Sequence, residues 1–104
     1  MGGQVMVKKA PTGEEFWLNV EYGRPVARIE SVEELIEALK VAPAESFKHH
    51  LREGANDFAA WIEGSLKDKA LAARVKKVRL HPQFETTRDE LIEILKHGTH
   101  QQAA

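Results

Sequence analysis

The chain has 104 residues, 30% of them charged, with a net charge of −1, no cysteine and two methionines, a composition that leans towards thermophile proteins. The length predicts one domain over residues 1–104, which buries roughly 60–65% of the surface of its unfolded chain. The lack of cysteine excludes a disulfide, a thiolate metal site and a cysteine nucleophile, and it predicts a cytoplasmic location. The absence of long apolar runs and of an export signal argues against a membrane protein, and the near-zero charge argues against a DNA-coating protein.

The N-terminal third predicts strands. Residues 1–13 contain a short apolar run at 5–7, which is consistent with either a flexible arm or an added strand. Residues 16–20 and 25–29 alternate apolar with other side chains around Tyr22, Gly23 and Arg24, so we predict a β-hairpin. Two strands alone are marginal in water, so the hairpin must lie against helices, gain a third strand or pair with a second copy; the last option predicts a homodimer.

Two helices are predicted after the hairpin. Ser31 begins the first, because Glu34 lies three residues later and completes a capping box. Pro43 ends this helix and suits the first turn of the next, which we expect to run to about Arg52 before a left-handed Gly54. The buried stripe of the first helix has i, i+3, i+4, i+7 spacing and consists of Val32, Leu35, Ile36 and Leu39.

Three more helices are predicted towards the C-terminus. Asn56 is the expected N-cap of the first, and Asp68 of the second, which Pro82 ends. A capping box over residues 87–90 begins the last helix, Gly98 ends it, and residues 99–104 form a disordered tail. The predicted fold is therefore α+β: a hairpin of two strands, or three with residues 5–7, packed on a bundle of four to five short helices.

The corner between the second and third helices holds the most informative pattern. Its residues are Phe47, His50, Asn56, Asp57, Phe58, Trp61 and Ile62. With the preceding hairpin and the following Leu71 and Ala72, this spacing resembles a family of small archaeal and bacterial domains of unknown function, over roughly residues 15–75.

The resemblance implies that four of these residues, namely His50, Asn56, Asp57 and Trp61, are signature positions. It also implies a domain found alone or appended to larger enzymes, including carbohydrate-active ones, with no catalytic activity of its own. The chain departs from the family pattern at Tyr22 and Gly23, where Asp-Gly is commoner, and at Gly64.

His50 is the residue most open to a catalytic interpretation. It lies on the apolar side of its helix, where Asp57 can reach and orient its ring across the corner. Such a pair either locks two helices together or acts as a general base. We favour the structural role, because no nucleophile or oxyanion donor is identifiable nearby.

Neither a metal nor another cofactor is expected. His49 and His50 are adjacent and therefore point to different sides of a helix, while His97 and His100 lie on either side of Gly98 at a predicted helix end.

Two surface features are candidate binding sites. Trp17 lies on the strand face opposite Phe16 and Leu18, so it is either an interface anchor or packed under a helix. The second feature is a basic stretch, which either complements a helix dipole or docks on the phosphates of a structured RNA such as a ribosomal subunit. That stretch consists of Arg74, Lys76, Lys77, Arg79 and the nearby His81.

We interpret the chain as a non-catalytic interaction module that self-associates through its hairpin and binds a larger partner, either a protein or ribosomal RNA. Phe58 and Trp61 are expected to be core residues rather than ligand contacts. The alternative is an enzyme or small-ligand sensor that uses His50 and Asp57 in a cleft beside Trp61.

Overall fold

A computed structural model describes residues 9–20, 25–52 and 54–103 of the chain. The predicted third strand at residues 5–7 and the hairpin turn at residues 22–24 lie outside these ranges. Of the predicted arm, residues 9–13 are described: Lys9 forms an isolated antiparallel bridge with Ser31, and the Ala10 amide donates to the Glu30 carbonyl at 2.7 Å. The chain before the hairpin therefore runs beside the start of the first helix.

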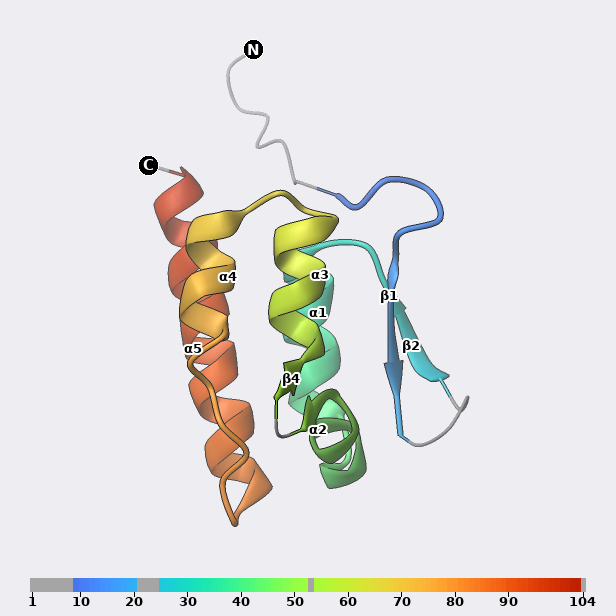
Figure 1. The fold of residues 1–104 in the computed structure, drawn as a ribbon, viewed down its shortest axis with the longest axis vertical. Coiled ribbons are helices and arrows are strands. Elements are labelled where there is room, and N and C mark those ends of the chain that lie inside the picture. Colours follow the sequence, from blue (N-terminus) through green and yellow to red (C-terminus); the bar gives the residue numbers. More distant parts are fainter. Residues whose placement is uncertain (1–8, 21–24, 53, 104) are drawn as a thin grey trace.

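The described elements are arranged in layers, with the hairpin on one side, α1, α2 and α3 in the middle, and α4 and α5 on the other side (Figure 1). This arrangement confirms the predicted α+β class. The hairpin consists of β1 (Phe16–Asn19) and β2 (Pro25–Ile29), and the helices are α1 (Val32–Val41), α2 (Ala44–His50), α3 (Asp57–Gly64), α4 (Lys69–Val75) and α5 (Phe84–Ala103). No helix in the described ranges is long and apolar enough to cross a membrane.

The hairpin has one buried and one exposed face. Antiparallel pairing sets Phe16 opposite Ile29 and Trp17 opposite Arg28, with an irregularity after Leu18. Directly paired side chains share a face, and successive residues alternate between faces. Phe16, Leu18 and Ile29 are accordingly buried against the helices, whereas Trp17 and Arg28 are on the outer face.

Helix α1 begins as predicted. The Ser31 hydroxyl accepts the Glu34 amide at 3.2 Å, and the four predicted stripe residues are all buried. The Glu34 carboxylate accepts the amide of Glu30 at 2.7 Å, one residue before the N-cap. The reciprocal half of the capping box is therefore shifted back by one residue. Pro43 stands between the two helices as the N-cap residue of α2.

Helix α2 ends at His50, so the predicted extension to Arg52 is wrong. The next residues form a two-residue antiparallel ribbon of β3 (Leu51–Arg52) and β4 (Ala55–Asn56). Gly54 has the expected positive φ, at 79°, but it serves the turn of this ribbon. A left-handed glycine suits both a helix end and a tight hairpin, and the sequence does not separate the two.

Helix α4 also ends earlier than predicted, at Val75 instead of near Pro82. The segment at residues 76–83 begins with two turns, in which the amides of Lys77 and Val78 donate to the carbonyls of Arg74 and Val75. Val78 is buried there without being helical, because it packs into the core from this connecting segment. The apolar residues Leu71, Val75 and Val78, spaced four and three residues apart as in a helix, therefore continue past the true end of α4.

Helix α5 differs from the prediction at both ends. It begins at Phe84, and the fully buried Thr87 does not cap it; instead the Thr87 hydroxyl accepts the amide of His81 at 2.8 Å. At the other end the helix continues through Gly98 to Ala103, in place of the predicted disordered tail at 99–104. Gly98 permits a close approach to α4, since a Cβ there would lie 2.6 Å from Cδ1 of Leu71.

Candidate functional site

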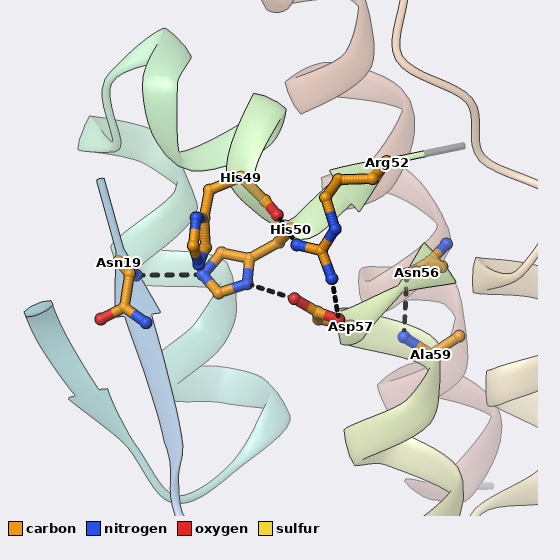
Figure 2. Close-up of polar contacts among 7 residues, drawn as sticks. All are labelled: Asn19, His49, His50, Arg52, Asn56, Asp57 and Ala59. Atoms are coloured by element: carbon orange, nitrogen blue, oxygen red, sulfur yellow. Dashed lines mark hydrogen bonds and ion pairs between the residues drawn. The ribbon is translucent and has the colours of Figure 1, made fainter. Parts of the chain in front are cut away.

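The β3–β4 ribbon brings the end of α2 next to the start of α3. Asn56 caps α3 as predicted, because its Oδ1 accepts the Ala59 amide at 3.0 Å (Figure 2). Its Nδ2 donates to the Val75 carbonyl at 2.9 Å. One side chain thus satisfies the beginning of α3 and fastens it to the end of α4.

His50 connects three elements at this corner. Its side chain is almost fully buried, with Nε2 3.0 Å from the Asn19 amide of β1 and Nδ1 2.9 Å from Oδ2 of Asp57 in α3 (Figure 2). A backbone amide can only donate, so Nε2 must be the unprotonated nitrogen, and Nδ1–H donates to the carboxylate. The ring also packs against Phe16, with centroids 4.8 Å apart, and Phe58, at 5.4 Å. These contacts assign a neutral Nδ1–H tautomer.

The pKa of His50 is lowered, and burial is the main cause. The hydrogen bond and the charge of Asp57 raise that pKa, but they do not overcome the loss of solvation. Protonation of Nε2 would also replace the acceptor of the Asn19 amide with a second donor, and two donors facing each other repel. Since both ring nitrogens are engaged by the protein, neither is free to take a proton from a ligand, and the geometry favours the structural interpretation of the pair.

The buried neutral His50 makes stability depend on pH. Below the ordinary value of about 6.5 the unfolded chain binds a proton that the folded chain does not, so the free energy of unfolding falls as the pH decreases. The expected slope approaches about 1.4 kcal/mol per pH unit between the lowered folded pKa and 6.5. Urea unfolding at a series of pH values above about 5, where most carboxylates stay charged, measures this slope.

His50→Gln is the control for this pH dependence. A glutamine oxygen can still accept the Asn19 amide, but it does not titrate, so the part of the slope due to His50 should disappear although the variant is less stable. An unchanged slope in the variant would assign the pH dependence to other groups.

Asp57 joins the buried corner to the surface. Its side chain is one-third exposed, and Oδ1 lies 3.5 Å from Nη2 of Arg52. The other terminal nitrogen of Arg52, Nη1, donates to the His49 carbonyl. Arg52 is exposed at the ribbon. The Asp57 carboxylate therefore interacts with both the buried His50 ring and the exposed Arg52 guanidinium.

Beside this corner lies an open groove of about 960 Å³, here called the corner groove. Asp57 lines it, whereas His50 and Trp61 do not. Trp61 is buried on the hairpin side, where its indole N–H donates to the Glu14 carbonyl at 2.7 Å and its ring contacts Phe16. The groove is lined by Leu51, Arg52, Gly54, Ala55, Asn56, Asp57, Ala59, Ala60, Glu63, Lys76, Val78, Arg79 and Leu80.

The predicted basic stretch is divided by the fold. Lys76 and Arg79 line the corner groove, and Lys77 is exposed outside it. In the described part of the chain, no carboxylate pairs with these three side chains; Arg79 donates to the Lys76 carbonyl at 2.9 Å. Arg74 is only partly exposed, and the His81 ring bonds to Glu90 at 2.9 Å.

Sequence reasoning did not assign a binding role to Arg52 or Leu80, which both line this groove. Arg52 lines the groove together with Lys76 and Arg79, but it comes from a segment far away along the chain, and no sequence spacing relates them. Leu80, which is 40% exposed, was not singled out either. The sequence did offer one signal for Leu80, because it is an apolar residue next to Arg79 and His81 in the basic stretch.

The outer face of the hairpin is a second exposed surface. Trp17 is 49% exposed and Val26 is 50% exposed, on the face that also carries Arg28. Arg28 pairs with Glu15 at 2.8 Å and with Glu30 at 2.9 Å. This surface therefore combines an aromatic and an aliphatic side chain with a charged border.

Metal-ligating side chains do not gather in the described ranges, where no group of three or more histidine or acidic residues could hold an ion. His97 bonds to Glu93 one turn away, at 2.9 Å.

Comparison with known proteins gives one match. The model of a family described as a family of unknown function, DUF5752, matches residues 14–104. No curated protein and no solved structure matches the chain.

Proposed function

The chain belongs to the DUF5752 family of unknown function, and we propose that it is a non-catalytic interaction module that self-associates through its hairpin and binds a larger partner. The observation that carries this proposal is the exposure of Trp17 on the outer hairpin face, opposite the side that packs on the helices. The absence of cysteine supports a reducing, cytoplasmic location.

The outer hairpin face suits a second copy of the same chain. Tryptophan is the residue type most enriched among interface anchors, and its burial removes a large apolar area from water. The border carries both signs of charge, on Arg28, Glu15 and Glu30, so two copies related by a twofold axis across this face can set opposite charges against each other. Trp17 and Val26 would form the apolar centre.

A protein is better supported as the larger partner than an RNA. The exposed Lys76, Lys77 and Arg79 do favour an anionic partner. His81, which the RNA hypothesis also uses, is engaged, however, because its ring bonds to Glu90. The nearby aromatic side chain of Phe84 packs 6.0 Å from the ring of Phe47. A ribosomal partner remains an outcome that the experiments below would detect.

The enzyme alternative lacks support from the geometry at the corner. A general base needs a free nitrogen within reach of a substrate, and both nitrogens of His50 are bonded within the protein. Trp61 is separated from the corner groove, so the predicted cleft would not contain it.

Light scattering coupled to size exclusion tests self-association. The wild-type protein is expected to have the mass of a dimer and to dissociate on dilution. Trp17→Ala is expected to weaken the dimer at least about tenfold, equivalent to about 1.4 kcal/mol. Val41→Ala is the matched control, because Val41 is also highly exposed but lies at the end of α1. A wild-type monomer at every concentration, or a Trp17→Ala dimer of unchanged strength, would contradict the proposal.

A further inference from the structure

We infer that the corner groove binds an acidic amphipathic segment of a protein partner. This inference rests on the proposed function, since it names the chemistry of the larger partner that the module recognises. It assigns to Arg52, Lys76 and Arg79 a joint role that their positions in the sequence do not suggest.

The floor of the corner groove is apolar and made of aliphatic side chains. Leu51, Ala59 and Val78 are buried beneath it, and Ala55 and Ala60 leave space above. Leu80 stands exposed in its lining. Side chains of moderate size, such as leucine or isoleucine, could remove this surface from water by entering the groove.

The charged side chains that line the groove are three cations and two acids, so positive charge is in excess. The acids are Asp57, which is engaged by His50 and Arg52, and the exposed Glu63. Arg52 comes from β3, whereas Lys76 and Arg79 come from the segment after α4. Their charges remain largely available, because Arg79 is held by a backbone carbonyl and Arg52 shares Asp57 with His50 at the longer distance of 3.5 Å. Carboxylates on a bound segment would therefore pair best with Lys76 and Arg79, which no carboxylate of the described residues engages.

An apolar floor beside cations fits a peptide better than a nucleic acid. Single-stranded RNA is held by stacking its bases on aromatic side chains, and none of the residues that line the groove is aromatic. A phosphate backbone would leave Leu51, Val78 and Leu80 without apolar partners. A helix or extended segment with apolar anchors and flanking acids satisfies both parts of the surface.

A random peptide library displayed on phage tests the inference with the full-length protein as bait. Selection on wild-type protein is followed by counter-selection on the double variant Lys76→Glu/Arg79→Glu. Synthetic copies of the recovered peptides are then measured by fluorescence anisotropy at low and high salt. The matched control is Lys69→Glu/Lys77→Glu, which makes the same change in charge at exposed positions outside the groove.

The recovered peptides should combine aspartate or glutamate with aliphatic residues such as leucine or isoleucine. Their affinity should fall at least about tenfold on Lys76→Glu/Arg79→Glu, by less than about twofold on the control, and also with rising salt. Recovery of no peptide, or of peptides that bind both variants equally, would overturn the inference. A random RNA pool measured in parallel would also overturn it, if that pool binds wild-type protein and is lost only on Lys76→Glu/Arg79→Glu.

Failure here is separable from failure of self-association. Trp17→Ala leaves the groove intact and is expected to bind the selected peptides as the wild type does. A dimer that binds no peptide would refute only the proposed peptide binding in the groove. A monomer that binds peptides would refute only the proposed self-association through the hairpin.

Discussion

Replacing Phe58 with alanine is expected to lower the free energy of unfolding by about 3–5 kcal/mol. The side chain is fully buried, and its ring lies 5.3 Å from that of Phe16 and 5.4 Å from that of His50. Phe58 thus supports the hairpin and the corner together. Small domains have only about 5–15 kcal/mol of net stability, so one truncation should remove a large part of it.

Urea unfolding followed by tryptophan fluorescence measures this loss, because Trp61 is buried close to Phe16. Val41→Ala serves as the control, since its side chain is 83% exposed and its truncation is expected to change stability by less than about 0.5 kcal/mol. A Phe58→Ala protein that unfolds at the same urea concentration as the wild type would show that the assigned core is wrong.

Helix caps and strand faces, which depend on neighbouring residues, were predicted correctly from the sequence. The caps at Ser31, Asn56 and Asp68 are all present, with the Asp68 side chain accepting the Leu71 amide at 3.1 Å. A cap depends on one side chain and an amide two or three residues later, so neighbouring residues suffice to predict it. The alternation that hides Phe16 and exposes Trp17 is local for the same reason.

The sequence failed where contacts with residues outside the helix set the ends of helices. Thr87 reads as an N-cap, yet its hydroxyl is used by His81, and Gly98 reads as a helix end, yet it makes room for Leu71. In both cases the residue type suited the predicted role, and a contact with a residue outside the helix gave it another role. Boundaries of this kind are not encoded by neighbouring residues alone.

The candidate site divides in the same way. The pairing of His50 with Asp57 was predictable, since both flank one tight corner and their side chains suit each other. The second bond of His50, to the Asn19 amide, required the hairpin to be docked on α2. That bond decides the chemistry, because it occupies the nitrogen that a general base would use. The corner groove likewise exists only once the ribbon and the segment after α4 lie together.

His50→Ala is expected to lower the free energy of unfolding by about 2–4 kcal/mol, because it leaves the Asn19 amide without its acceptor and opens a cavity against Phe16 and Phe58. Asp57→Ala should cost less, since the carboxylate is partly exposed. Asp57→Asn should be mild, at about 1 kcal/mol or below, because an amide oxygen still accepts from a neutral Nδ1–H.

A double-mutant cycle with His50→Ala and Asp57→Ala separates the two roles of this pair. A lock between α2 and α3 predicts a coupling energy of about 1–2 kcal/mol in urea unfolding, because each side chain loses its effect once the other is gone. Asp57→Asn distinguishes the charge states: a loss as large as that of Asp57→Ala would mean that the pair is an imidazolium with a carboxylate. Full stability in both alanine variants, with loss of peptide or ligand binding instead, would make this corner a binding site and contradict its structural role.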